Sequence, residues 1–429
     1  MSLPRFRSSR LWIAPLVGIG AAAVLAAAAL YIDAQFDWDG DPPFPLFGGS
    51  PSTARTLYSI IATATTTLLA LVFTILAVMI QLGSSQYSPR VLRTLFQDFP
   101  SHFTIGIFVA TIAYALLMLL VLGPGDEDAR GFATTIAFAM AVLAIVTFAI
   151  YANHIVHTAR ISSIINRVAT ETRRLIDAEF PEPFSADRAP PPMLSAPSAV
   201  VPSSRWGVIV DVDDSRLVEA AAADGVVISL SAGIGEQVHE GAPLITIHGD
   251  RPADATSLRD HVELASERQL RRDVGWGLRI LTDIATRSVS TGINDATTAT
   301  QALDRSHALL RVLVGRSLAV GVRTGDNGDV RVLVPTPDWE HFVSLATDEV
   351  RRDGASSVQV MRRLRELLVD LERVAPEERK TSVRRRLELL DRAVGDEIGE
   401  EHDRTLTERI AVPGDDRGPT VTDRRSAGA

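Results

Sequence analysis

The chain contains 429 residues, carries a formal net charge of −9 at pH 7 and has no cysteine. The absence of cysteine excludes disulfides, thiolate nucleophiles and cysteine-based metal or iron–sulfur sites, and the negative charge argues against nucleic-acid binding. Lys380 is the only lysine, which argues against a P-loop, a Schiff base in the folded core and a lipoyl or biotin attachment site.

Four hydrophobic segments without a charged side chain dominate the first third of the chain. A helix needs about 20 apolar residues to cross the hydrocarbon core of a bilayer, and the four segments reach about that length. They are Leu11–Ile32, Thr56–Leu82, Phe103–Gly123 and Gly131–Asn153. The first could instead be a signal peptide, but its apolar run exceeds the usual core of about 7–15 residues. The pattern predicts a four-span transmembrane domain over residues 1–153.

Arginines and carboxylates alternate between the loops that join these segments. Arginines precede the first segment and follow the second and fourth, at Arg5, Arg7, Arg10, Arg90, Arg93, Arg160, Arg167, Arg173 and Arg174. The other two loops are acidic, with Asp33, Asp37, Asp39, Asp41, Asp126, Glu127 and Asp128. The positive-inside rule therefore predicts that both termini are cytoplasmic. The strong preference for Arg over Lys is typical of a GC-rich bacterial genome, so the expected location is the bacterial plasma (inner) membrane.

The rest of the chain divides by composition into four parts. Apolar residues at helical spacing predict a cytoplasmic stalk helix over 154–180 that continues the fourth span. Prolines predict a linker over 181–203, an α+β cytoplasmic domain is expected over 204–398, and the polar residues 399–429 are expected to be disordered. Helices in the domain are predicted at Leu258–Val289, Asp295–Val314, Asp338–Asp353, Ser356–Val374 and Pro376–Ile398.

Strands are predicted in two places within this α+β domain. Trp206–Gly249 contains four short β-branched runs, WGVIVDVD, RLVEAAA, GVVISLS and PLITIHG, separated by Asp and Gly turns. Part of it resembles half of a barrel-sandwich hybrid, the fold of lipoyl domains, without the hairpin lysine. Further along, Asn327-Gly328 predicts a hairpin between Leu318–Arg323 and Val330–Pro335.

Two sequence blocks carry a resemblance to a known family. SSQYSPRVLRTLFQDF follows the second segment, and DVGWGLRILTDIATRSVSTGINDATTATQALD lies in the predicted cytoplasmic domain. Together with the four spans, these blocks resemble DUF2254, a bacterial family of predicted membrane proteins. The resemblance extends from Leu11 to about Leu390. It implies an integral membrane protein and supplies no catalytic residues. Family members typically have proline where this chain has Ala296.

The second hydrophobic segment has one small and polar face, which we call the polar stripe. It follows steps of three and four residues through Ser59, Thr63, Thr66, Ala70, Thr74, Ala77, Gln81 and Ser84. Such a face either packs closely against neighbouring helices or lines a water-filled path around an oligomer axis. In the second case Ser59, Thr63, Thr66, Thr74 and Gln81 are the pore-lining candidates.

The loop after this segment offers a second candidate region. Arg90 and Arg93 satisfy the positive-inside rule. They could also link a gate to acidic residues of the cytoplasmic domain, or bind anionic lipid head groups. His154 and His157, at the inner end of the fourth segment, lack a nearby third ligand, so no metal site is predicted.

The block Asp273–Thr298 is the densest in unusual residues. One interpretation is a tight helix–turn–helix, with an Asp283–Arg287 pair along the first helix and Asn294 or Asp295 capping the second. The other is a pocket for a small ligand or an anion at that helix N-terminus, although a capping carboxylate weakens an anion site. The candidate ligand-binding residues are Trp276, Arg279, Asp283, Arg287, Asn294, Asp295 and Thr298.

No catalytic motif, nucleotide-binding loop or metal signature is present in the sequence, so neither an enzyme nor a cofactor is expected. None of the four segments contains Asp, Glu, His, Lys or Arg, which argues against a proton-driven transporter. The leading hypothesis is an oligomeric small-ion channel with a cytoplasmic regulatory domain. The alternative is a membrane-tethered sensor or scaffold that binds a small ligand or a protein partner.

Overall fold

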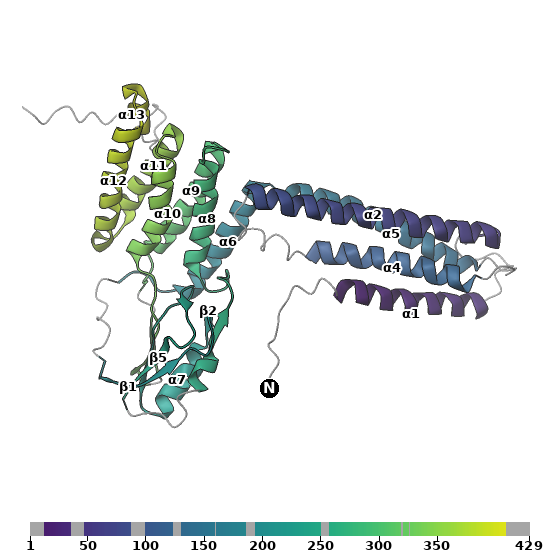
Figure 1. The fold of residues 1–429 in the computed structure, drawn as a ribbon, viewed down its shortest axis with the longest axis horizontal. Helices are drawn as coiled ribbons and strands as arrows, with labels where there is room; N and C mark the ends of the chain where they lie inside the picture. Colours follow the sequence, from purple (N-terminus) through teal and green to yellow (C-terminus); the bar gives the residue numbers. More distant parts are fainter. Residues whose placement is uncertain are drawn as a thin grey trace, which may run out of the picture. The chain divides into compact units, whose positions relative to one another are not determined.

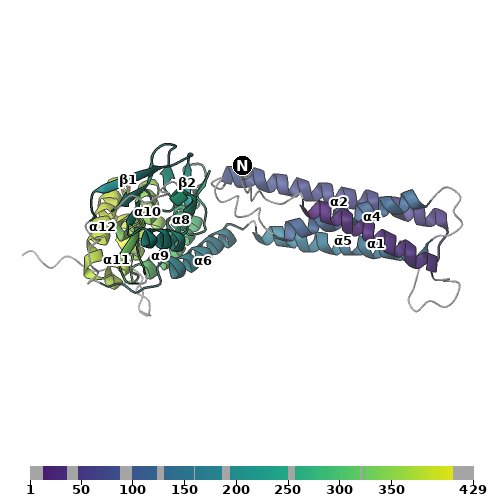
Figure 2. The same ribbon diagram turned by 90° about the horizontal axis from the view of Figure 1, so that it is seen from below.

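The computed structural model describes residues 13–35, 47–86, 99–122, 130–158, 160–185, 194–249, 257–318, 321–325 and 327–408. The chain divides into two compact units, Met1–Arg160 and Ile161–Ala429 (Figures 1 and 2). The first is called the N-terminal unit below and the second the C-terminal unit.

Four helices make up the described part of the N-terminal unit: α1 (Ile13–Gln35), α2 (Pro51–Gln86), α4 (Phe99–Val121) and α5 (Gly131–Thr158). All four contain a stretch that is long and apolar enough to cross a membrane, which confirms the four predicted apolar helices. In Figures 1 and 2 they run alongside one another. Helix α4 packs against each of the other three.

Small residues bring α1 and α4 together. Gly18, Ala22, Ala26 and Ala29 are the buried positions of α1, one per helical turn. A Cβ atom on Gly18 would lie 2.6 Å from the carbonyl oxygen of Gly106 in α4. Close backbone approach of this kind replaces side-chain interdigitation in apolar helix pairs, so α1 is held by a seam of small residues.

Seven of the described helices of the C-terminal unit form a bundle beside a β-rich part (Figure 1). They are α6 (Ile161–Glu179), α8 (Val274–Ser288), α9 (Ala296–Leu313), α10 (Trp339–Asp353), α11 (Val358–Val374), α12 (Glu377–Glu397) and α13 (Glu401–Glu408). The predicted helices from Asp295 to Ile398 correspond to α9–α12. The stalk prediction was wrong in one respect: α5 ends at Thr158 and α6 begins at Ile161. Because α6 buries its apolar face against α8 and α9, it belongs to this bundle.

The strands form two sheets. A five-stranded mixed sheet has the order β1-β5-β3-β8-β7, and a three-stranded sheet has the order β4-β2-β6. Their bounds are β1 Pro197–Pro202, β2 Gly207–Val212, β3 Val227–Leu230, β4 Gln237–Val238, β5 Pro243–His248, β6 Val262–Ala265, β7 Val322–Thr324 and β8 Val330–Leu333. Strands β7 and β8 form the predicted hairpin, with Gly328 at φ +80°. Because β8 pairs with β3 in parallel, the five-stranded sheet extends beyond the predicted β-rich stretch.

Several predicted boundaries differ from the structure. RLVEAAA lies in a helix, α7 (Asp214–Ala223), because Asp213 caps it and alanines favour helix. The start of the predicted helix at Leu258 contains a short 3₁₀ turn and strand β6, whose Val262 and Leu264 are buried. Strand β1 lies within the predicted linker, where it pairs with β5. Helix α13 lies in the predicted disordered tail, and residues 409–429 are outside the described residues.

Candidate functional site

The polar stripe lies on the side of α2 that faces away from its own bundle. The buried positions of α2 are Ala54, Tyr58, Ile61, Ala62, Thr65 and Val72, and they lie on the face that packs against α4 and α5. In contrast, Ser59, Thr63, Thr66, Ala70, Thr74, Ala77 and Gln81 are all exposed. Packing within this unit therefore does not account for the stripe.

The threonine hydroxyls on this face donate their hydrogen bonds inside the helix. Thr66 Oγ1 donates to the carbonyl of Ala62 at 2.7 Å, and Thr74 Oγ1 donates to that of Ala70 at 2.9 Å. The neighbouring Thr67 donates to the carbonyl of Thr63 at 3.0 Å. A hydroxyl has one donor and two acceptor lone pairs, so these groups keep acceptor capacity. The exposed face thus carries uncharged oxygen acceptors. It is only weakly polar, because the hydroxyl protons are already bonded within the helix. Arg90 and Arg93, the gate or lipid-contact candidates, lie outside the described residues.

The candidate ligand-binding residues are divided between the two ends of α8. Trp276 is in the first turn of α8, whereas Asn294, Asp295 and Thr298 lie beyond its last turn. A 15-residue helix spans about 22 Å. The seven candidates therefore do not line one pocket.

Trp276 belongs to a structural cap at the start of α8. The Asp273 carboxylate accepts from the Trp276 backbone N–H at 2.8 Å and from two nitrogens of Arg268, at 2.8 and 3.0 Å. The Arg268 guanidinium also lies over the Trp276 ring, 4.9 Å from its centroid. Arg268, Asp273 and Trp276 thus contact one another, which indicates that they form a packed structural cap at the start of α8.

Arg279 and Asp283 connect α8 to α10. Arg279 donates to both carboxylate oxygens of Glu349, at 2.6 and 2.8 Å, and its Nε pairs with Asp283 at 2.7 Å. The hydrogen bonds that Arg279 donates to Glu349 raise the pKa of Arg279 and lower the pKa of Glu349. Asp283 thus has an ion-pair partner four residues earlier in α8, Arg279.

Asp295 is the cap of α9. Its carboxylate accepts from the Thr298 backbone N–H at 3.0 Å and from the Thr298 hydroxyl at 2.6 Å, and the hydroxyl bond lowers the pKa of Asp295. Asn294 precedes it in a left-handed conformation, with φ +49°, which Asn tolerates better than most residues. The carboxylate occupies the helix N-terminus, as the capping interpretation predicts.

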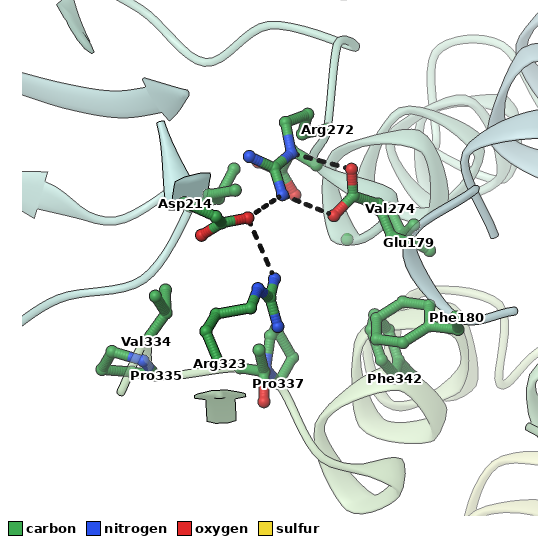
Figure 3. A pocket seen from close by; sticks show the side chains of 14 residues that line it. Glu179, Phe180, Asp214, Arg272, Val274, Arg323, Val334, Pro335, Pro337 and Phe342 are labelled. Carbon is green, nitrogen blue, oxygen red and sulfur yellow. Dashed lines mark hydrogen bonds and ion pairs between the residues drawn. The ribbon is translucent and has the colours of Figure 1, made fainter. Parts of the chain in front are cut away.

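A pocket in the C-terminal unit lies elsewhere, where α6, α7, the β-rich part and the start of α8 meet. It is a small cavity of about 50 Å³ between charged and apolar side chains (Figure 3). Arg272 lines this cavity and pairs with Glu179 through two bonds, at 2.8 and 3.0 Å, and with Asp214 at 3.0 Å. Arg323 reaches the same oxygen of Asp214 at 3.2 Å.

All five N–H donors of Arg272 are engaged. Besides Glu179 and Asp214, the guanidinium donates to Asp211 at 3.2 Å and to the carbonyl of Val212 at 2.8 Å. The two hydrogen bonds that Arg272 donates to Glu179 are the main cause that raises the pKa of Arg272. A guanidinium has five donors and no acceptor, so none remains for a ligand. We call Glu179, Asp211, Asp214, Arg272 and Arg323 the Arg272 cluster, and it joins the bundle to the β-rich part.

Sequence analysis did not single out this cluster. Arg272 is 93 residues from Glu179 and 61 from Asp211, so no helical or strand spacing connects them. The one local signal was the acidic run DVDDS at 211–215 together with the adjacent Arg271 and Arg272.

Four apolar helices long enough to cross a membrane, followed by an α+β unit with mixed sheets, define a multi-pass membrane protein. The family described as "Predicted membrane protein (DUF2254)" matches residues 8–370, and the chain belongs to this family. An uncharacterized protein of Mycobacterium bovis and one of Mycobacterium tuberculosis are each 30% identical to it over 416 residues, covering 92% of this chain and 78% of the relative. No solved structure matches the chain.

Proposed function

We propose that the protein is an oligomeric small-ion channel of the bacterial plasma membrane, with α2 of each copy around the path. Both termini would be cytoplasmic, and the C-terminal unit would regulate the path. The single observation that supports this proposal is the exposure of the polar stripe on the outer face of α2.

The outer faces of the other helices provide the contrast. Their exposed large side chains are apolar, for example Val24 of α1, Leu120 of α4 and Ile150 of α5, which are 71%, 81% and 65% exposed. Such faces suit contact with lipid tails. A face with Ser59, Thr63, Thr66, Thr74 and Gln81 suits protein or water, because polar groups in hydrocarbon are unfavourable without partners.

The chemistry of the stripe favours small cations over anions. The hydroxyls of Thr66 and Thr74 donate inside the helix and keep lone pairs for water or a cation. A path lined by uncharged oxygens binds ions weakly enough to release them, which conduction requires. A ring of copies would repeat each hydroxyl at one height around the axis.

Flux measurements on stripe variants test the proposal. Thr66→Leu and Thr74→Leu place bulky apolar groups on the path and should reduce cation flux into proteoliposomes about tenfold or more, by analogy with hydrophobic constrictions that dewet a pore. Phe73→Leu is the matched control, because it introduces the same side chain at the neighbouring position, 52% exposed but apolar. Equal flux in all three variants and the unmodified protein would show that α2 does not line the path.

The alternative, a membrane-tethered sensor or scaffold without a pore, has less support. Trp276, Arg279 and Asp283 belong to contacts within the C-terminal unit, and the donors of Arg272 are saturated. A sensor would have to bind its ligand through other groups.

A further inference from the structure

A half-buried histidine bridges α9 and α11 with both of its ring nitrogens. His307 of α9 is 15% exposed and lies with Nε2 2.8 Å from Asp370 Oδ2 of α11. Its Nδ1 lies 2.8 Å from Arg363 Nη2, also of α11. The chain Arg363–His307–Asp370, which we call the histidine bridge, therefore crosses the interface between these helices.

The partners fix the protonation state of this histidine. An arginine nitrogen can only donate, so Nδ1 must present its lone pair to Arg363. The proton of the neutral ring is then on Nε2 and is donated to Asp370. A second proton on Nδ1 would face the Arg363 N–H at hydrogen-bond distance. The bridge as it stands is compatible only with neutral His307.

The charged groups around the bridge come from the two helices that it joins. From α9 they are Asp304, which pairs with Arg363, and Arg311, which lies 2.5 Å from Asp370. From α11 they are Arg363, Glu366, Asp370 and Arg373; Arg363 lies 3.6 Å from Glu366, and Arg373 lies 2.8 Å from Asp370. Helix α6, which also packs on α9, contacts it through Asn166 and Arg305. Asp370 is thus shared by three cationic or protonatable groups, while Arg363 faces His307 directly.

We propose that the histidine bridge is an acid-sensitive contact, which holds α9 to α11 at neutral pH and is released when His307 takes up a proton. Protonation would break the Arg363–Nδ1 bond and place two cations against each other. Helix α9 packs against α6, and α6 follows α5 in the chain, so the release would loosen the support of the segment that follows the last apolar helix.

His307 binds a proton less readily in the folded protein than in a state in which the bridge is open. Burial is the main cause that lowers the pKa of His307 below its ordinary value of 6.5, and Arg363 and Arg311 lower it further against the effect of Asp370. The native state then binds fewer protons than the opened state. The contribution of neutral His307 is complete above pH 6.5 and is lost as the pH falls from 6.5 towards the native pKa.

Hydrogen exchange on the full-length protein in detergent micelles tests this inference. Protection factors, corrected for intrinsic exchange, are measured for peptides in 299–313 and 358–374 between about pH 7.5 and pH 5.5, the range in which histidines titrate. Wild-type protection should fall on acidification, by about tenfold for each pKa unit between the native and opened states. In His307→Gln this fall should disappear, whereas His341→Gln, at an exposed position of α10, should retain it.

A second variant keeps the test decisive if the His307→Gln protein does not fold. Arg363→Met removes the cation that opposes protonation, so the midpoint of the loss should move to higher pH. An unchanged midpoint in Arg363→Met would overturn the proposal, as would constant protection in the wild type. An equal fall in His307→Gln would assign the acid response to carboxylates and overturn it as well.

Discussion

Gly277→Ala should destabilise the C-terminal unit by about 3 kcal/mol or more, because the added methyl group has no space. A Cβ atom at this position of α8 would lie 1.9 Å from Thr172 Oγ1, 2.7 Å from Thr172 Cγ2 and 2.8 Å from Thr172 Cβ in α6. Rotation of the threonine cannot clear all three contacts, so the two helices must separate. Thermal unfolding of the full-length protein in detergent, followed by tryptophan fluorescence, measures the effect.

Two further variants separate this clash from a general effect of glycine replacement. Gly395→Ala, in α12, meets nothing within 4 Å and should be neutral or stabilising by up to about 1 kcal/mol, because alanine favours helix. Thr172→Ala removes the two nearest atoms and should recover part of the loss when combined with Gly277→Ala. A Gly277→Ala protein as stable as the wild type would show that α6 and α8 are not in close contact.

Arg272→Met should destabilise the C-terminal unit by about 3–5 kcal/mol, the usual result of removing one partner from a buried ion pair. The variant leaves Glu179 without the guanidinium that binds both of its oxygens, and takes one partner each from Asp211 and Asp214. These carboxylates are only 19–25% exposed, so an unpaired negative charge on them is unfavourable.

The neighbouring arginine provides a matched control for this prediction. Arg271 also pairs with Asp211, at 2.9 Å, but it is 49% exposed, and exposed ion pairs contribute about 0–1 kcal/mol. Chemical denaturation of Arg271→Met and Arg272→Met should consequently give unequal losses. Equal losses would mean that the Arg272 cluster does not hold the bundle to the β-rich part.

The features predictable from the sequence were those with a local cause. The charge-free runs predict the four apolar helices, Asp295 is placed to cap α9, and Asn327-Gly328 is typical of the turn between β7 and β8. In each case the deciding interaction lies within a few residues. The helix predicted over Val262–Ala265 was wrong because tertiary pairing with β2 decides the type of this segment. The strand predicted for RLVEAAA was wrong although its local signals, the cap Asp213 and the alanines, favour the helix that the structure shows.

The candidate site depended on information that the sequence does not contain. Periodicity identifies the polar stripe but not the neighbour that it faces, because this depends on which side of α2 packs against α4 and α5. The Arg272 cluster unites residues from four segments, and its pairs become visible only after the chain has folded. The seven candidates in the Asp273–Thr298 block are close in sequence, yet α8 separates them in space.

Single-cysteine crosslinking tests the central claim, that the polar stripe faces other copies of the chain. The chain has no native cysteine, so Thr66→Cys and Thr74→Cys each introduce one reactive thiol on the stripe, and Leu120→Cys places one on an exposed apolar position of α4, 81% exposed. Oxidation in native membranes should crosslink both stripe variants between copies and leave the Leu120→Cys variant monomeric. No crosslink on the stripe, or one at position 120 of equal yield, would contradict the account.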